Sequence, residues 1–243
     1  MRVEMLKSVA EMTPGQWNSI VGGHSIICSH EYLRAVEDSK INDCRFFYPV
    51  VYDEKGLAAH ACVYYITTEL DSLARGMLKR AITGIRRHWP SFMILRSLEC
   101  GSPVSLGTTI AYRADADRIA SLMAIAAAVE NLARELGVRV ILMRDFVSET
   151  VAFYDHLRER GYFRIHNLPD TCLPILWSSF ENYLASLRSA YRNKAKSRLA
   201  RFVRAGGTMR LVSDYGSLAG TLVSLWGNTF DRAKEYRREQ LNP

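Results

Sequence analysis

The stretch DRIASLMAIAAAVENLARELGVRVILMRDF, residues 117–146, decides the fold of this chain. Its apolar side chains recur every three or four positions and so share one helix face: Ile119, Leu122, Met123, Ala126, Val129, Leu132, Ala133 and Leu136. This spacing predicts a helix that starts after Asp117 and ends at Gly137. The run VRVILMRDF follows at once and has the composition of a buried strand. A long helix joined closely to a strand is typical of an α/β sheet.

The segments on either side extend this pattern. FMILRSLECG (92–101) is a strand candidate that runs into a loop, and CRFFYPVVYDEKGLAAHACVYYITTEL (44–70) has two β-rich runs around the turn signal DEKG. The second pattern predicts a hairpin. Downstream, Ser148 is expected to cap a helix that Gly161 ends, after which residues 162–176 return as extended chain. Strands and helices that alternate with short links predict a mixed α/β sheet flanked by helices.

Helical segments are also expected near both ends of the chain. TPGQW (13–17) has a capping threonine before a proline, and a second helix is predicted to begin at Ser29 in SHEYLRAVEDS. After Trp177 the pattern becomes helical over 179–205. We then expect a short strand in TMRLVSD (208–214) and a last helix from about Ser217.

The positive charge is concentrated in the last quarter of the chain. The net charge of the 243 residues is +7, yet residues 182–243 hold 12 Lys and Arg against 4 Asp and Glu, and residues 1–181 hold 20 against 21. This distribution argues against a protein built throughout for a polyanion and favours one local basic surface. We therefore divide the chain into a lobe over 1–178 and a basic linker helix with the start of a second lobe over 179–243.

Cysteine usage and the hydrophobic runs exclude several classes of protein. The five cysteines are scattered with no CxxC pair, which favours a reducing compartment and gives no zinc pattern. The first residues lack the apolar core of a signal peptide, and the longest small-apolar run, 119–129, is shorter than the roughly 20 residues of a membrane span. The sequence predicts a soluble, cytoplasmic protein without a metal.

Three segments carry a resemblance to a known superfamily. ETVAFYDHLRERGYFRI (149–165) is similar to the segment of GNAT acyltransferases in which a tyrosine precedes a Gly-aromatic pair. SHEYLRAVEDS (29–39) and SFENYLASLRSAYRNKAKSRLARF (179–202) resemble the FemAB-like branch, where a YL-x-SLR-x-x-YR-x-K helix joins two GNAT lobes. The resemblance covers most of residues 25–243, and the predicted order of elements agrees with it. It implies a GNAT-like mixed sheet with a C-terminal helical extension.

The resemblance also implies an activity. A FemAB-like acyltransferase would move an acyl or aminoacyl group to an amino group of a small-molecule or cell-wall-type acceptor. Its donor would be acyl-CoA, acetyl-CoA for example, or aminoacyl-tRNA, and no metal is implied. Because the chain ends with KEYRREQLNP (234–243), near where a second lobe's sheet would begin, we expect that a second lobe is missing.

The chain departs from the GNAT pattern in two places. The loop GSPVSLGTTIAYRADAD (101–117) lacks the Q/R-x-x-G-x-G/A pattern whose backbone N–H groups hold the CoA pyrophosphate. In addition, Tyr154 stands seven residues before Gly161, where four is usual. The first departure favours a second hypothesis, in which the lobe binds an anionic ligand without catalysis.

Acyl transfer to an amine needs a base, an oxyanion donor and an acid for the leaving group. Glu99 at a strand end is the candidate base, with a strand-end ion pair as the alternative, and Tyr154 is the candidate acid, unless its ring only packs on the sheet. Asp145 follows a strand, where α/β sites gather, but it could equally cap the next helix. Arg144 beside it is assigned to substrate binding. Cys100 is interpreted as a small buried side chain rather than a nucleophile.

The basic helix offers a binding surface. An apolar stripe recurs along it at Phe180, Leu184, Leu187, Tyr191, Ala195 and Phe202. Beside the stripe, Arg188, Tyr191, Arg192 and Lys194 are predicted to bind phosphates of CoA, tRNA or a nucleotide-linked acceptor. The alternatives are a solvated charged face and, with weaker support, a nucleic-acid-binding module.

Residues 75–89 form a second basic segment. Five cations, Arg75, Lys79, Arg80, Arg86 and Arg87, alternate with apolar residues. Such a helix can lie on an anionic membrane surface, which makes peripheral membrane contact one hypothesis. The alternative is an ordinary amphipathic helix that covers a sheet.

Overall fold

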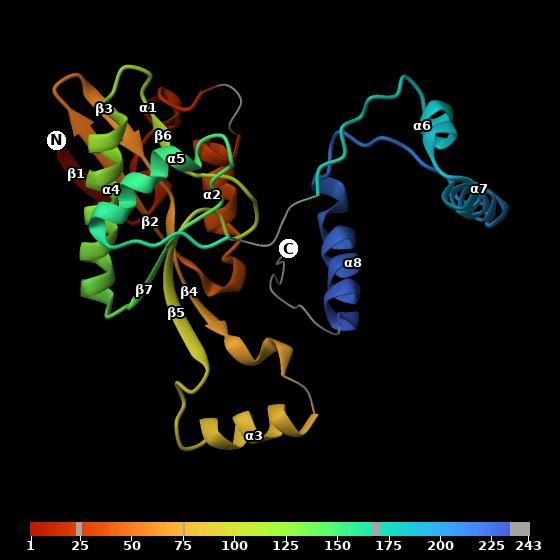
Figure 1. The fold of residues 1–243 in the computed structure, drawn as a ribbon, viewed down its shortest axis with the longest axis horizontal. Helices are drawn as coiled ribbons and strands as arrows, with labels where there is room; N and C mark the ends of the chain where they lie inside the picture. The colour runs from red at the N-terminus through yellow and green to blue at the C-terminus, as the bar shows by residue number, and fades with distance from the viewer. Residues whose placement is uncertain (23–25, 75, 167–170, 234–243) are drawn as a thin grey trace. The chain divides into compact units, whose positions relative to one another are not determined.

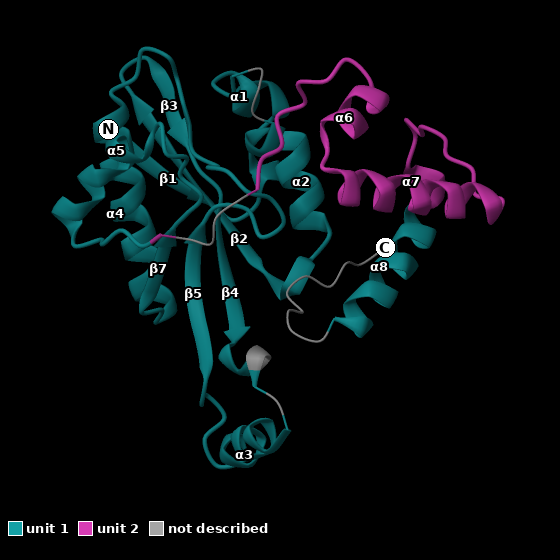
Figure 2. Ribbon diagram, turned by 45° about the vertical axis from the view of Figure 1, so that its right-hand side comes forward, with its two compact units in different colours: residues 1–165, 219–243 teal, residues 166–218 magenta. Residues whose placement is uncertain are grey.

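The computed structural model describes residues 1–22, 26–74, 76–166 and 171–233. Two compact units are present: residues 1–165 with 219–243 form the first, and residues 166–218 form the second (Figure 2). The first unit contains the sheet and its flanking helices, and the described residues of the second contain two α-helices and a short 3-10 helix. The predicted boundary between residues 178 and 179 stays a prediction.

The described residues form one mixed sheet, shown in Figure 1, in the order β6-β3-β2-β4-β5-β7, with β1 paired to β2. Its strands are β1 (Arg2–Leu6), β2 (Arg45–Asp53), β3 (Gly56–His60), β4 (Val63–Glu69), β5 (Ile94–Cys100), β6 (Ala111–Tyr112) and β7 (Val140–Met143). Every pairing in this sheet is antiparallel except that of β5 with β7, which is parallel. The predicted α/β class, a mixed central sheet flanked by helices, is confirmed.

The helices occupy the connections between these strands and the C-terminal part of the chain. The α-helices are α1 (Pro14–Asn18), α2 (His30–Asp38), α3 (Gly76–Arg86), α4 (Arg118–Leu136), α5 (Val151–Tyr154), α6 (Phe180–Ser186), α7 (Ser189–Arg204) and α8 (Ala219–Arg232). The 3-10 helices are η1 (Val9–Glu11), η2 (Ile26–Cys28), η3 (Ile41–Asp43), η4 (Leu70–Leu73), η5 (Asp155–Arg160) and η6 (Gly216–Leu218).

Helix α4 forms as predicted and covers one face of the sheet. Asp117 caps its N-terminus through a hydrogen bond from the Ala120 N–H (2.9 Å), and Gly137 ends it with φ +66°, which glycine adopts without strain. Leu122, Ile125 and Val129 are fully buried against the sheet. Together with strand residues such as Leu98 they form the largest of three apolar clusters in the described residues.

Helices α1 and α2 cover the opposite face. Trp17 of α1 and Leu33 of α2 pack with Tyr48 and Tyr64 of the sheet in the second core. Both helix starts agree with the predictions, since Thr13 and Ser29 accept hydrogen bonds from backbone N–H groups of the first turn. The sheet therefore lies between two helical layers, which fixes the face on which each strand side chain lies.

Strands β5 and β7 are joined through α4 by a parallel crossover. Their register pairs Glu99 with Leu142 and Cys100 with Met143, so both strands end at the same edge. The residues that follow these ends are consequently neighbours in space, although more than 40 positions separate them in sequence.

Strands β4 and β5 extend together beyond the rest of the sheet, and α3 lies at the far end of this extension (Figure 1). Seven registered pairs run without interruption from Val63–Cys100 to Glu69–Ile94. We call β4, α3 and β5 the arm. The expected helix over part of 75–89 is present as α3, and Arg75 lies outside the described residues.

Several expectations about individual elements are wrong. The segment after Ser148 is a short helix, α5, whose cap position is Thr150 and which continues into η5. The described parts of 162–176 and the segment 208–214 are not strands, and Ile175 is 84% exposed and Leu211 fully exposed. Strand β7 is half-buried rather than buried because it lies at the edge of the sheet. Strand β1 had not been expected.

In the second unit, the predicted helix over 179–205 is divided in two. Helix α6 begins after Ser179, whose side chain accepts a hydrogen bond from the Asn182 N–H (3.2 Å), and it ends at Ser186. Helix α7 begins at Ser189, so Leu187 and Arg188 separate the two helices. The apolar stripe predicted along one continuous helix is therefore divided between α6, the break and α7.

Candidate functional site

Four side chains meet where β5 and β7 end, and we call them the strand-end cluster: Tyr64, Glu99, Arg144 and Asp145. The Tyr64 hydroxyl donates to Glu99 Oε2 at 2.6 Å, and Arg144 Nη1 donates to the same oxygen at 2.7 Å and to the Tyr64 hydroxyl at 2.7 Å. Three of the four were predicted as site residues, and the fold brings these three together.

Local backbone geometry explains why these residues meet. The Arg144 N–H donates to the Cys100 carbonyl at 3.2 Å, which extends the parallel pairing by one step past the end of β7. Gly101 then leaves room for the arginine, because a Cβ at position 101 would lie 2.7 Å from Arg144 Cγ. Tyr64 faces Glu99 because the two are directly paired across β4 and β5.

Both oxygens of Glu99 are engaged. Oε1 accepts a hydrogen bond from the Ser97 hydroxyl at 3.0 Å, and Oε2 accepts from Tyr64 and Arg144. The side chain is only 7% exposed. A carboxylate that accepts this many hydrogen bonds has a fixed position and in turn fixes Arg144.

Asp145 differs from Glu99 in two respects. It is a non-glycine residue with φ +64°, a conformation that costs energy and that is most easily adopted by Asn and Asp. One oxygen, Oδ2, accepts from Arg144 Nε at 2.9 Å, while Oδ1 makes no hydrogen bond to the described residues. A nearly buried carboxylate with one oxygen unengaged can accept a proton or an N–H group from a ligand.

The electrostatics of the cluster favour a cation. Burial alone would lower the pKa of the Arg144 guanidinium, but the Tyr64 hydroxyl and the Asp145 and Glu99 carboxylates raise it above its usual range. With both carboxylates ionised, one arginine faces two negative charges. A ligand ammonium or amine would therefore be attracted to this edge of the sheet.

Tyr154 lies on the other face of the sheet. It is buried in the α4 core with Leu98 and Cys100, and its ring stacks on Phe146 with centroids 3.6 Å apart. Glu99, between Leu98 and Cys100, points to the α2 face. Burial raises the pKa of Tyr154, so its hydroxyl is protonated at neutral pH. The fold does not bring Tyr154 into the strand-end cluster, although Phe146, on which its ring stacks, directly follows Asp145.

Cys100 is buried as expected. Desolvation raises the pKa of its thiol to about 12, and the thiol is therefore protonated and a poor nucleophile.

The sequence reading missed two tyrosines near these strand ends. Tyr64 was missed because the register between β4 and β5, which places it opposite Glu99, could not be predicted from the sequence. Tyr32 of α2 forms hydrogen bonds with the hydroxyls of Ser102 (3.2 Å) and Ser105, and so holds the loop after β5. The hydroxyl-rich sequence of that loop was the available signal.

The N-terminus of α4 does not fit a CoA pyrophosphate. The Asp117 carboxylate already accepts the Ala120 N–H, and it places a negative charge where the phosphate would lie. Moreover, strand β6 separates the glycine-containing loop from the helix. The start of α4 thus agrees with the absence of the Q/R-x-x-G-x-G/A pattern from residues 101–117.

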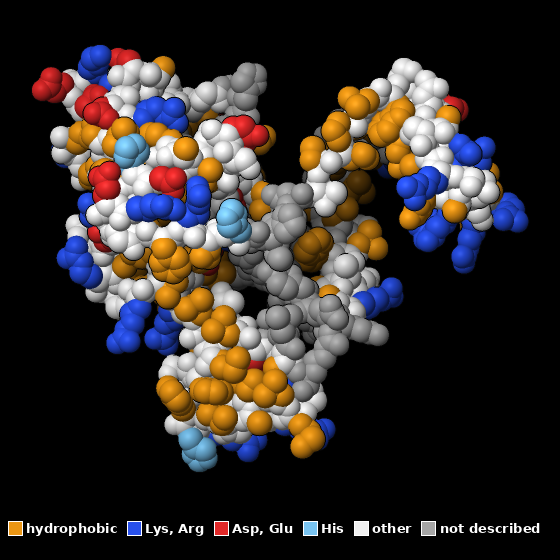
Figure 3. Space-filling view, in the orientation of Figure 1, with side chains coloured by type: hydrophobic (Ala, Val, Ile, Leu, Met, Phe, Trp, Pro, Cys, Tyr) orange, Lys and Arg blue, Asp and Glu red, His pale blue; other side chains and the backbone are white. Residues whose placement is uncertain are grey.

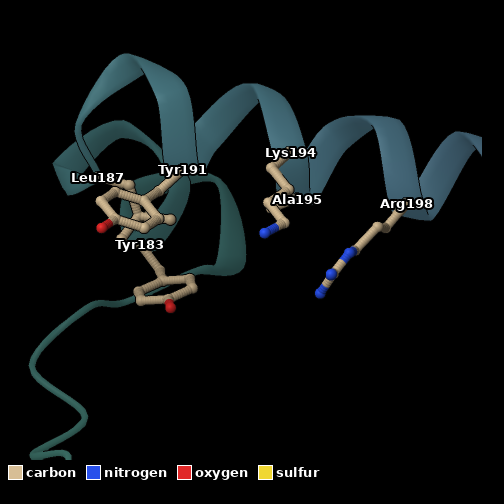
Figure 4. A pocket seen from close by; sticks show the side chains of 6 residues that line it. All are labelled: Tyr183, Leu187, Tyr191, Lys194, Ala195 and Arg198. Carbon is tan, nitrogen blue, oxygen red and sulfur yellow. The ribbon is translucent and has the colours of Figure 1, made fainter.

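The predicted substrate residues of the basic helix lie on or next to α7. Tyr191 and Lys194 line a shallow pocket of about 290 Å³ together with Tyr183, Leu187, Ala195 and Arg198 (Figure 4). Arg192 instead donates to the Ala185 carbonyl at 3.0 Å, and Arg188 occupies the helix cap position. Two of the four residues thus share the pocket, and their role in substrate binding stays a prediction.

No group of three or more His, Cys, Asp or Glu side chains that could hold a metal ion is found in residues 1–22, 26–74, 76–166 and 171–233. Within the same ranges, none of the helices has the length and apolar character needed to cross a bilayer.

Comparison with known proteins gives one clear sequence similarity. No protein-family model matches the chain. Two curated proteins of Mycobacterium tuberculosis, from strains CDC 1551 / Oshkosh and ATCC 25618 / H37Rv, are provisionally named 8-amino-7-oxononanoate synthase 2, and each is 32% identical to it over 216 residues. The match covers 88% of this chain, which spans only 28% of the length of these curated relatives.

Solved structures show weaker likenesses. A Bacillus halodurans protein has a TM-score of 0.47 at 10% identity, covering 71% of this chain and 100% of its own. A ribosomal-protein-alanine N-acetyltransferase from Brucella melitensis biovar Abortus 2308 has a TM-score of 0.42 at 9% identity, covering 72% of this chain and 100% of its own. Both TM-scores lie below 0.5.

Proposed function

We propose that this chain is an acyltransferase of the GNAT type that moves an acyl or aminoacyl group from an activated donor to an amine. The observation that carries the proposal is the strand-end cluster, with the unengaged Oδ1 of Asp145 beside the Arg144 guanidinium. The motif resemblance in residues 29–39, 149–165 and 179–202 supports the reaction class.

Each residue of the cluster has a distinct role in this proposal. Asp145 binds the amine and accepts its proton. Arg144 holds the carbonyl oxygen of the acyl group through Nη2, which makes no hydrogen bond to the described residues. Glu99 and Tyr64 are positioning residues, because their contacts with Nη1 fix the guanidinium.

The reaction is a direct attack. The amine nitrogen forms a bond to the acyl carbon, and the bond from that carbon to the donor's sulfur or oxygen breaks. The electron pair of the broken bond stays with the leaving atom, which takes a proton. The proposed source is the proton that Asp145 accepts from the amine, because Tyr154 lies on the other face of the sheet.

The donor is proposed by class only. Acyl-CoA and aminoacyl-tRNA both carry phosphates, and the pocket lined by Tyr191, Lys194 and Arg198 offers cations and aromatic rings for such a group. Because the start of α4 does not fit a pyrophosphate, a CoA donor would have to be held elsewhere on the chain.

The test is a transfer assay with radiolabelled acetyl-CoA or labelled aminoacyl-tRNA and a panel of primary amines. We expect Asp145→Asn to lower kcat/KM by about 100-fold or more. The exposed Glu54→Gln is the matched control and should leave kcat/KM unchanged. An Asp145→Asn variant with the activity of the parent chain would contradict the assignment.

The second candidate function is a binding lobe without catalysis, which the Asp117 cap at α4 favours. It is supported if acetyl-CoA or tRNA raises the melting temperature while no acceptor becomes labelled. Absence of both binding and transfer with every donor would rule out both functions.

A further inference from the structure

The arm ends in an apolar surface that the rest of the described chain leaves open. Met77 is 85% exposed, Leu78 62%, Ile85 42% and Trp89 59%. Figure 3 shows hydrophobic side chains gathered over the projecting end of the molecule at α3. We call these four residues the arm-tip patch. The alternative that this helix covers a sheet face does not hold, because α3 lies beyond the end of the sheet.

One ion pair fixes which side of α3 faces outward. Arg86 donates to Asp71 at 2.7 Å and to the carbonyls of Phe92 (3.0 Å) and Met93 (3.3 Å), and Asp71 is only 2% exposed. Ile82, one turn before Arg86, is buried on the same side of the helix. The inward face is therefore occupied by Ile82 and Arg86, and the arm-tip patch is held outward.

The charges around the patch have one sign. No acidic residue occurs between Ser72 and Leu98 in the sequence. Arg86 is compensated by Asp71 and Glu69. The other cations of α3 and of the turn after it, Lys79, Arg80 and Arg87, form no ion pair with the described residues. The surface next to the patch thus carries uncompensated positive charge.

We propose that α3 and the turn after it dock on an anionic lipid bilayer, with Met77, Leu78, Ile85 and Trp89 entering the headgroup–acyl boundary. The patch is convex and lies at the tip of a projection, so it fits a broad, deformable surface rather than the groove that a partner protein would offer. Lys79, Arg80 and Arg87 have long side chains that can contact lipid phosphates while the apolar side chains are buried. This docking does not depend on the acyltransferase proposal.

The experiment is co-sedimentation of the full chain with vesicles of phosphatidylcholine alone or of phosphatidylcholine with about one third phosphatidylglycerol, whose negative surface potential attracts basic segments. We expect binding to the anionic vesicles that weakens as salt increases. Met77→Glu with Ile85→Glu should lower the bound fraction on the order of tenfold. Ile119→Glu on α4 is the matched control, because Ile119 is 43% exposed and Ile85 is 42% exposed.

Two further measurements separate the possible outcomes. First, Lys79→Gln with Arg80→Gln should reduce both the binding to anionic vesicles and its salt dependence. Second, brominated lipids should quench part of the total tryptophan fluorescence of the parent chain, and this quenching should be absent in Trp89→Phe. Equal binding to neutral vesicles, or none to anionic ones, would overturn the proposal. So would self-association in sedimentation velocity that Ile85→Glu abolishes, because a second copy would then be the occupant.

Discussion

His60 shows how one buried side chain makes stability depend on pH. Its ring stacks on Trp17 with centroids 3.7 Å apart, Nε2 lies 3.2 Å from the Trp17 carbonyl, and Nδ1 has no hydrogen-bond partner in the described chain. Burial lowers the pKa of His60 to about 3 from the ordinary value of 6.5. Below pH 6.5 the unfolded chain therefore binds a proton that the folded chain does not.

We expect this histidine to destabilise the fold as the pH falls from about 6.5 towards about 3. Each pH unit in that window costs up to about 1.4 kcal/mol, and the effect is absent above it. Urea unfolding of the parent chain and His60→Gln at pH 7 and pH 5 measures this effect. The variant should lose less stability on acidification, and equal losses in both proteins would contradict the prediction.

Gly101 controls the strand-end cluster by its lack of a side chain. A Cβ at this position would lie 2.7 Å from Arg144 Cγ, so Gly101→Ala should displace the arginine from Glu99 and Tyr64. We expect a loss of about 1–3 kcal/mol of unfolding free energy, as for other overpacked sites. Gly15→Ala is the control, because a Cβ at position 15 would have no atom within 4 Å. Gly56→Ala is unsuitable, because φ at Gly56 is +110°. Thermal unfolding of Gly101→Ala and Gly15→Ala distinguishes crowding from a general effect of alanine.

At the scale of elements, Asp117 at the start of α4 is an N-cap whose loss can be measured. Asp117→Ala removes the acceptor of the Ala120 N–H and should lower the unfolding free energy by about 1 kcal/mol. Asp117→Asn keeps an acceptor and should lower it much less. Denaturant unfolding of the three proteins tests the cap, and equal stability of the alanine variant would show that the hydrogen bond contributes nothing.

The elements that the sequence predicted correctly are those with strong local signals. Helix α4 has both a periodic apolar face and two caps, and β5 and β7 are short apolar runs on either side of it. The segment 208–214 has the composition of a strand but pairs with no strand of the described residues, which composition alone does not reveal. Strand formation needs a partner, so it is decided by the whole sheet.

The candidate site, like the fold, was predictable only in part from the sequence. Glu99, Arg144 and Asp145 were identifiable because residues that follow adjacent parallel strands meet at one edge. Tyr64 was not, because its position depends on the register between β4 and β5, and 35 residues separate it from Glu99. The separation of Tyr154 from Glu99 was not predictable either. Tyr154 packs with Leu98 and Cys100, whose side chains lie on the opposite face of β5 from that of Glu99, and assigning these faces requires knowing how β5 pairs.

At the scale of the whole molecule, positive charge gathers in both units. Lys and Arg side chains are numerous on α7 in the second unit (Figure 3), whereas in the first unit Lys79, Arg80 and Arg87 lie in the same segment as the arm-tip patch. Binding of labelled tRNA should depend on the cations of α7 and not on those of the arm. We expect Lys194→Gln/Arg198→Gln to reduce this binding. In Lys79→Gln/Arg80→Gln it should weaken with salt as it does in the parent chain. Filter binding over a salt series checks this, and an effect of the arm substitutions on tRNA binding would contradict it.

The uninterrupted pairing of β4 with β5 fixes the distance between the strand-end cluster and the far end of the arm. Glu99 lies five strand positions from Ile94, where β5 meets the arm's far end, and each position advances about 3.4 Å, giving a height of ~17 Å. If α3 rests on a bilayer, this pairing fixes how far above the lipid headgroups the amine-binding edge stands. A lipid-anchored acceptor would need a polar tether of that reach, and one with a shorter stem would stay below the edge however tightly the arm were docked.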